Sequence, residues 1–80
     1  MRQLVKIRPA ENQFRFYAVD VLPGLFGNWA VVREWGRIGQ PGTLRRDWYN
    51  SQEQAEQEAG KLIERKTRRG YQVSGHPAPP

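Results

Sequence analysis

Apolar and polar residues alternate in short runs through the first half of the chain, which is the spacing of β-strands with one buried face. Residues 3–8 form the first run, in which Val5 and Ile7 share one predicted face and two basic residues share the other. Pro9 ends this strand, because proline cannot donate a hydrogen bond to a neighbouring strand. We therefore expect Val5 and Ile7 to face the core.

Three further runs predict three further strands. Residues 14–22 carry apolar side chains on both faces, which predicts a central place in a sheet. The loop that follows is rich in glycine, and we expect its Leu25 and Phe26 to fold back over one end of the core. Residues 29–35 are rich in β-branched and aromatic side chains, and residues 43–49 return after a glycine- and proline-containing loop. One face of the third run carries Trp29, Val31, Arg33 and Trp35.

A different spacing predicts a helix that begins after Ser51. This serine is a suitable N-cap, and Gln54 follows three residues later, which is the spacing of a capping box. Positions that repeat at i, i+4, i+7 and i+8 predict one helix face, made of Ala55, Ala59, Leu62, Ile63 and Lys66. Acidic residues in the first half and basic residues in the second complement the helix dipole, and Gly70 is placed to end the helix.

Together these elements predict the α+β class. A twisted antiparallel sheet of four to five strands needs a cover for its apolar face, and one long amphipathic helix packed on that face provides it. The fifth strand would be short, within residues 71–73. We expect a single domain of residues 1–73, followed by a disordered proline-rich tail of residues 74–80. The predicted core comprises Leu4, Val5, Ile7, Phe14, Phe16, Val19, Val21, Trp29, Val31, Val32, Trp48, Leu62 and Ile63.

Composition limits the chemistry that these 80 residues can perform. There is no cysteine, and the one histidine, His76, lies in the proline-rich tail, so the sequence contains neither a nucleophile–base pair nor a metal-ligand motif. Asp20, Glu34 and Asp47 are better explained as solvated or ion-paired groups than as acid–base catalysts. We expect no catalytic residue, no metal, no cofactor and no small-molecule substrate, and therefore a protein that is not an enzyme.

Charge indicates a different class of partner. The 13 Lys and Arg residues against 8 Asp and Glu residues leave a formal charge of +5, and the sequence pI is about 10.2. Such an excess favours polyanions, above all nucleic acid. No apolar run is long enough for a signal peptide or a membrane span, so we expect no membrane partner and a cytoplasmic location, with the nucleoid as the place of a DNA-binding form.

An ordered set of motifs carries a family resemblance. The run NWAVVREWGRIG is followed by Gly42, an aromatic-bearing strand, a serine that opens a helix, and the basic segment ERKTRRGY. In this order the motifs closely resemble the WGR domain family, which is named after the tripeptide that stands here as Trp35, Gly36 and Arg37. The resemblance covers about residues 12–71 and looks like that of a stand-alone bacterial member.

The resemblance implies a function. WGR domains occur in DNA-dependent poly(ADP-ribose) polymerases and in bacterial proteins, and in the polymerases the domain contacts DNA near a strand break while its tryptophan stacks on a terminal sugar. By this resemblance Trp35 is the stacking platform of a module that binds the DNA backbone or a duplex end or nick. We expect little base specificity, because the sequence predicts no recognition helix with base-reading side chains at its start. In the polymerases the arginine of the tripeptide passes a signal to neighbouring domains, and that role is not carried over to Arg37, nor is ADP-ribosyl transfer carried over to the chain.

The residues themselves fit this chemistry. Trp35 can offer a flat face to a base or sugar, Gly36 lets the backbone approach a phosphate, and Arg37 can hold two phosphate oxygens through its planar fork. Gly39 permits the turn that follows. The remaining candidate contacts are basic residues of the return strand and the helix: Arg45, Arg46, Lys61, Arg65, Lys66, Arg68 and Arg69. Alternation allows at most one of the two adjacent strand arginines to lie on the side of Arg37.

Several alternatives stay open at this point. Trp35 could be a core residue, Arg37 could pair with a carboxylate, and the basic segment could be a solvated helix end that stabilises the helix dipole. RNA could take the place of DNA. The Trp-Gly-Arg surface could also dock a protein partner, since Trp and Arg are frequent hot-spot residues. A basic surface continuous from Arg37 to the helix end would favour nucleic acid, whereas an apolar patch around Trp35 would favour protein.

Overall fold

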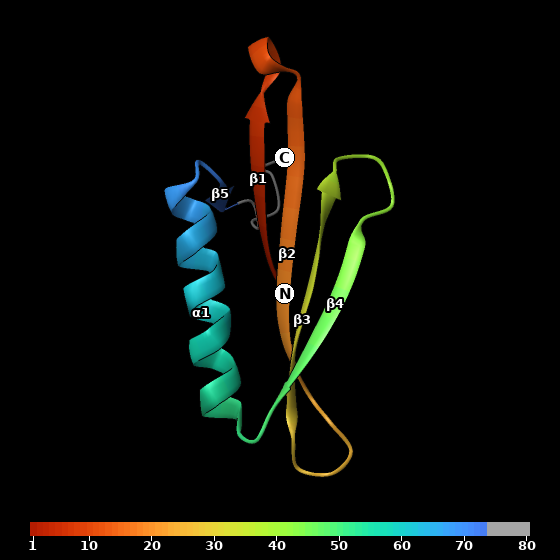
Figure 1. The fold of residues 1–80 in the computed structure, drawn as a ribbon, viewed down its shortest axis with the longest axis vertical. Coiled ribbons are helices and arrows are strands. Elements are labelled where there is room, and N and C mark those ends of the chain that lie inside the picture. Colours follow the sequence, from red (N-terminus) through yellow and green to blue (C-terminus); the bar gives the residue numbers. More distant parts are fainter. Residues whose placement is uncertain (74–80) are drawn as a thin grey trace, which may run out of the picture.

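The computed structural model describes residues 1–73, which form a five-stranded antiparallel sheet with one helix against it (Figure 1). In chain order the elements are β1 (Arg2–Arg8), the 3-10 turn η1 (Pro9–Glu11), β2 (Gln13–Pro23), β3 (Trp29–Arg37), β4 (Thr43–Tyr49), α1 (Gln52–Arg68) and β5 (Gln72–Val73). The strands lie in the order β4-β3-β2-β1-β5. The predicted α+β fold is confirmed. The predicted tail, residues 74–80, lies outside the described residues.

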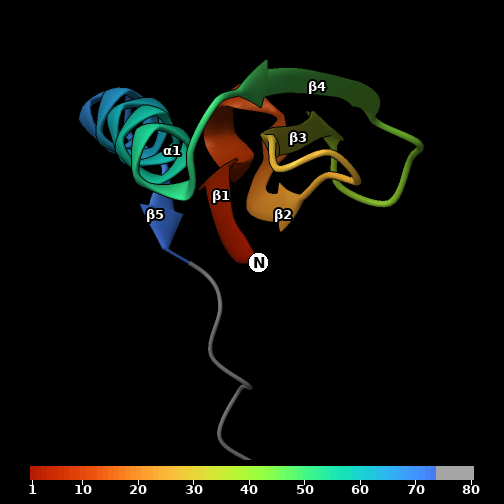
Figure 2. The same cartoon turned by 90° about the horizontal axis from the view of Figure 1, so that it is seen from below.

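The register of the sheet decides which side chains meet beneath α1. Leu4 pairs with Tyr17, and Tyr17 in turn pairs with Trp35, so these three side chains project from the same face. The helix covers this face, and its buried Ala55 and Ala59 let it approach the strands closely. Figure 2 shows α1 on one side of the sheet, and among the described residues no second layer covers the other side.

The buried core differs from the predicted one on β1. Leu4 and Tyr17 are fully buried with Val31 and the helix alanines. The prediction that Val5 and Ile7 face this core is wrong, and Ile7 is 53% exposed. The pairing of Leu4 with Tyr17 turns the Leu4 side of β1 toward α1, and the neighbouring positions therefore project from the uncovered face.

Two further core predictions are wrong at the opposite end of the sheet. Trp48 projects from the uncovered face and is 53% exposed. Leu25 and Phe26 do not fold back, since they are 93% and 91% exposed at the tip of the β2–β3 loop. This loop extends past the beginning of α1, beyond the part of the sheet along which the helix runs (Figure 1). A hydrogen bond from Gly24 N to Asn28 O, at 2.8 Å, closes the base of the loop.

The helix begins and ends as predicted. The backbone N–H of Gln54 donates to Ser51 Oγ at 3.1 Å, and Gly70 has a φ of +97° just after the last turn. In Figure 1, α1 and β3 run in the same direction. Their C-terminal ends, both rich in basic residues, therefore lie at the same end of the molecule.

Candidate functional site

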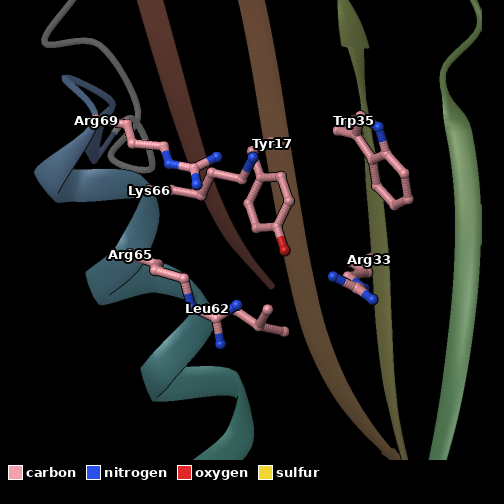
Figure 3. Close-up of a pocket in the computed structure, with 7 residues that line it drawn as sticks. All are labelled: Tyr17, Arg33, Trp35, Leu62, Arg65, Lys66 and Arg69. Carbon is pink, nitrogen blue, oxygen red and sulfur yellow. The ribbon is translucent and has the colours of Figure 1, made fainter.

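Two aromatic rings form the floor of a hollow between α1 and the sheet (Figure 3). Tyr17 on β2 and Trp35 on β3 are paired across the strands, and their ring centroids are 6.3 Å apart. Tyr71, which follows the helix, meets Tyr17 edge-on at a centroid distance of 6.4 Å. Tyr17 is only 2% exposed, whereas Trp35 is half-buried. Trp35 therefore packs against the core and also lines the hollow.

The hollow is a cavity of about 260 Å³ with mostly cationic walls. It is lined by Tyr17, Arg33, Trp35, Leu62, Arg65, Lys66 and Arg69. A second hollow of about 370 Å³ shares Trp35 and Lys66 with the first, and its other walls are Asn12, Arg15, Gly36, Arg37 and Tyr71. We call the two hollows together the basic cleft. It extends from Arg37 at the end of β3 to Arg69 at the end of α1.

Lys66 stands at the centre of the basic cleft. Its Nζ lies 4.9 Å from the centroid of the Tyr17 ring and 5.5 Å from that of Tyr71, so the ammonium group sits over two aromatic rings. Burial lowers the pKa of Lys66, and four nearby positive charges lower it further, those of Arg69, Arg33, Arg15 and Arg65. Desolvation first, and then the neighbouring positive charges, thus work against the ammonium form of Lys66.

Carboxylates offset only part of this charge. Asp47 pairs with Arg33 at 3.4 Å and with Arg45 at 3.3 Å. Among the described residues, no ion pair is formed by Arg15, Arg65, Lys66 or Arg69. A bound anion would supply the negative charge that the cleft lacks.

Two buried polar atoms in the cleft have no hydrogen-bond partner within residues 1–73. They are Tyr17 Oη and Arg33 Nε. Figure 3 shows the Tyr17 hydroxyl directed into the space between Leu62 and Arg33. A buried polar group without a partner costs about 1–3 kcal/mol. A ligand that accepts hydrogen bonds, such as a phosphate, would relieve that cost.

Gly36 and Arg37 have structural contacts in addition to their place in the cleft. A Cβ on Gly36 would lie 3.1 Å from the Cα of Gly42, and a Cβ on Gly42 would lie 2.7 Å from the Phe16 ring. The close approach that requires glycine at position 36 is therefore to the chain's own backbone. Arg37 donates hydrogen bonds to the backbone and side-chain oxygens of Asn12, at 3.3 Å and 3.2 Å, and so ties the end of β3 to the β1–β2 connection.

The structure gathers some of the predicted contact residues and separates others. The basic cleft is lined by Trp35, Gly36, Arg37, Arg65, Lys66 and Arg69. Arg45 projects from the same sheet face but is paired with Asp47. Arg46 projects from the opposite face, so only one of these adjacent arginines shares the side of Arg37.

Two predicted helix residues lie outside the cleft. Lys61 and Arg68 are exposed, line neither hollow, and pair with Glu58 and Glu64 of α1. Gly39, with a φ of +86°, lies in the β3–β4 loop and gives it the left-handed turn that was expected there. These positions shape the fold or the helix surface, and none of them forms a wall of the basic cleft.

Six wall residues are absent from the sequence-based set of contacts: Asn12, Arg15, Tyr17, Arg33, Leu62 and Tyr71. The alternation of side chains along a strand could have identified Arg33, because it shares a strand face with Trp35. The register of β2 against β3 adds Tyr17 and Arg15 to that face, since Tyr17 pairs with Trp35 and Arg15 with Arg37. This register could not be read from the sequence.

The chemistry that the cleft offers is cationic and aromatic. Within residues 1–73, no group of three or more His, Cys, Asp or Glu side chains is arranged to hold a metal ion. None of the described helices is both long and apolar enough to cross a membrane. Guanidinium and ammonium groups around exposed ring surface suit a ligand that combines anions with flat or apolar rings.

Comparison with known proteins places the chain among relatives. A protein-family model described as WGR domain matches residues 1–78. A curated protein of Sinorhizobium fredii (strain NBRC 101917 / NGR234), named Uncharacterized protein y4dW, is 35% identical over 66 residues, which make up 82% of this chain and 32% of that protein. The match thus spans about a third of the length of that relative. No solved structure gave a significant match.

Proposed function

Because the chain belongs to the WGR domain family, we propose that it is a non-catalytic module that binds nucleic acid through the basic cleft. The family is associated with nucleic-acid binding in proteins of the poly(ADP-ribose) polymerase type. The observation that carries the proposal is the cationic surface from Arg37 to Arg69, which the carboxylates of the described residues balance only in part. Nucleic acid presents a regular row of phosphates, and each phosphate contact releases condensed counterions.

The position of Trp35 favours a strand end or a nick over continuous duplex. Trp35 lies in the floor of a hollow and does not protrude, so a sugar or base reaches it only where stacked neighbours do not shield that nucleotide. There Trp35 stacks on the exposed nucleotide, an interaction worth about 1–3 kcal/mol per base in single-strand binders. Arg65 and Arg69 contact phosphates from the helix side of the cleft.

Base specificity is expected to be low. The cleft offers contacts to phosphates and to ring faces, which all nucleotides share. The helix packs along β2, β3 and β4, so it does not project toward a groove to read base edges. DNA is the proposed ligand, by the family association, and RNA of the same sequence is the competing ligand in the test.

Protein docking through the Trp-Gly-Arg surface is the competing function. Gly36 packs against Gly42, and Arg37 is held by Asn12, so the tripeptide offers no protruding patch. The hollow around Trp35 has cationic walls, and this favours a polyanion over an apolar protein surface.

Fluorescence anisotropy with labelled duplexes tests the proposal. An end-capped continuous duplex, a duplex with a 5′-phosphorylated nick, a blunt duplex and an RNA duplex of equal sequence are titrated at several salt concentrations. We expect the nicked and blunt duplexes to bind more tightly than the capped one. The logarithm of the affinity should fall linearly with the logarithm of salt concentration, with a slope of about −0.9 per phosphate contacted.

A matched pair of double variants separates the cleft from general charge. Arg65→Ala/Arg69→Ala and Lys61→Ala/Arg68→Ala each remove two basic side chains from α1 or its C-cap, but only the first pair lines the cleft. We expect the first variant to weaken binding about ten- to a hundred-fold and to reduce the salt slope by about 2. The second should change affinity less than about three-fold. Equal losses, or no binding at low salt, would contradict the proposal.

A further inference from the structure

An apolar surface lies on the side of the molecule that the basic cleft does not use. Gly24, at the base of the β2–β3 loop, packs beside the indole of Trp48, since a Cβ on this glycine would lie 2.7 Å from that ring. The loop tip is therefore continuous with the sheet face opposite α1. We call this region the apolar surface: its exposed apolar residues are Leu22, Leu25, Phe26 and Trp48, and Leu44 lies on the same face of β4 beyond Arg46.

This exposure is unusual in extent. Leu25 and Phe26 are adjacent and almost fully exposed. Trp48, whose side chain is larger still, is about half exposed. Scattered single apolar residues on a surface need no explanation, but a contiguous patch of several hundred Å² marks an interaction site. The apolar surface is therefore a candidate interface.

A pair of charges lies on the same sheet face. Glu34 pairs in register with Leu44, and Arg46 pairs with Val32, so the acid and the base project from neighbouring strands two positions apart. Neither forms an ion pair with any residue of the described part of the chain. A two-fold axis that places Glu34 of one copy beside Arg46 of the other also forms the reciprocal contact, which is the self-complementarity of a symmetric interface.

We infer that the apolar surface joins two copies of this chain in a symmetric dimer. Leu25 and Phe26 are almost fully exposed and Trp48 about half exposed, so these side chains of both copies, with the two other leucines, supply on the order of 1,000 Å², which is about the lower limit for a specific interface. The basic cleft lies on the opposite face of the sheet and stays open in such a dimer. This inference does not depend on the proposed nucleic-acid function.

Sedimentation velocity over about 1–500 µM protein tests the inference, a range that brackets interfaces of micromolar affinity. We expect a concentration-dependent monomer–dimer equilibrium. Leu25→Ser/Phe26→Ser changes only exposed side chains at a loop tip, so the fold is retained, which circular dichroism verifies, and dimer affinity should fall at least about ten-fold. Lys61→Ala/Arg68→Ala, on the exposed side of α1, serves as the control and should leave the dimer intact.

A charge exchange identifies the two-fold arrangement itself. Each single variant, Glu34→Arg or Arg46→Glu, turns both Glu34–Arg46 contacts of the dimer into pairs of like charge. Each should weaken the dimer about ten-fold. An equimolar mixture of the two variants restores both opposite-charge contacts, and a heterodimer should form with near wild-type affinity. A wild-type chain that stays monomeric throughout overturns the inference and leaves a different protein as the occupant. A dimer that neither the loop-tip variant nor the charge variants weaken also overturns the inference, because the interface then lies elsewhere on the molecule.

Discussion

The two faces of the sheet carry opposite chemistry, although the same strands build both. Toward α1, β3 presents Arg33, Trp35 and Arg37, which line the basic cleft. From the other face, β4 presents Leu44 and Trp48 to solvent. The helix thus covers the face that carries most of the arginines, and apolar side chains are left on the bare face. The face under α1 also carries the buried core of Leu4, Tyr17, Val19 and Val31, so its cations gather only at the end of the sheet where α1 stops.

The charged face carries an electrostatic and desolvation cost at two of its side chains. Lys66 is partly desolvated among arginines, and the buried hydroxyl of Tyr17 has no protein partner within residues 1–73. Groups that destabilise the free protein are concentrated at functional sites, because a bound ligand there can supply the missing charge or hydrogen bond. The changes below test whether the two faces act separately, from the largest expected effect to the smallest.

The largest effect is expected from Lys66→Glu. The new carboxylate would lie among four arginines and satisfy them in place of a ligand. We expect the affinity for nicked duplex to fall at least about a hundred-fold, or about 2.7 kcal/mol, while the thermal midpoint rises. Arg46→Glu reverses an equal charge on the other face, and with a short single-site duplex it should change affinity less than about three-fold. Anisotropy and thermal unfolding measure the two responses, and equal losses would contradict separate faces.

The tryptophans of the two faces provide a second comparison. Trp35→Ala removes both the stacking ring and a contact of the core, so we expect about ten-fold weaker binding and a loss of roughly 2–3 kcal/mol of unfolding free energy. Trp48→Ala should leave nucleic-acid affinity unchanged and abolish the dimer. Denaturant unfolding, anisotropy and sedimentation of both variants provide the data. If Trp48→Ala also weakens nucleic-acid binding, the two faces do not act separately.

A smaller change tests the unpartnered hydroxyl. Tyr17→Phe keeps the ring between Trp35 and Tyr71 and removes only the buried oxygen. We expect unfolding free energy to rise by about 1 kcal/mol, because an unsatisfied polar group disappears, and affinity for duplex to fall about three-fold. A variant that is less stable than the wild type would show that the hydroxyl already has a partner in the free protein.

The smallest effect is a pH dependence of stability. The pKa of Lys66 is lowered in the folded chain from its ordinary value of 10.5. Between the lowered pKa and 10.5 the unfolded chain binds more protons at this residue, so its contribution to stability rises with pH across that window. Below the window both states are protonated, and the full cost of the charged lysine remains.

Lys66→Met isolates this contribution, because it keeps an unbranched side chain over the Tyr17 and Tyr71 rings and removes the ammonium group. We expect the variant to be the more stable protein near neutral pH, and the difference in unfolding free energy to shrink as pH rises toward 10.5. Denaturant titrations at several pH values measure it. A difference that grows with pH would mean that the folded state stabilises the ammonium form.

Sequence reasoning succeeded where local signals decide the outcome. The capping pair of Ser51 and Gln54 and the stop at Gly70 depend only on nearby residues, and the helix forms between them. It was less successful where contacts with residues distant in the sequence decide which side chains are buried. Ile7 and Trp48 have the composition of core residues, but each projects from the face that no helix covers.

The candidate site divides in the same way. The Trp35–Arg37 run and the basic helix end could be identified from their types and their order along the chain. Arg15 and Tyr17 line the cleft only because β2 pairs with β3 in this register. Arg46 lies outside the cleft because it is one position along β4 from Arg45 and therefore projects from the other face. No single-sequence pattern carries that register.

The amino-acid sequence by itself determined the strand and helix segments, the net positive charge, and the presence of a tryptophan beside glycine and arginine. The tertiary structure alone decided which face of each strand α1 covers and which cations meet around Trp35. The physical reason is that alternation and capping act between neighbours in the chain, whereas charge density and burial depend on distances through space. The sequence alone places Arg65 and Arg69 near Lys66, and only the packing of α1 on β2 and β3 adds Arg15 and Arg33 to them.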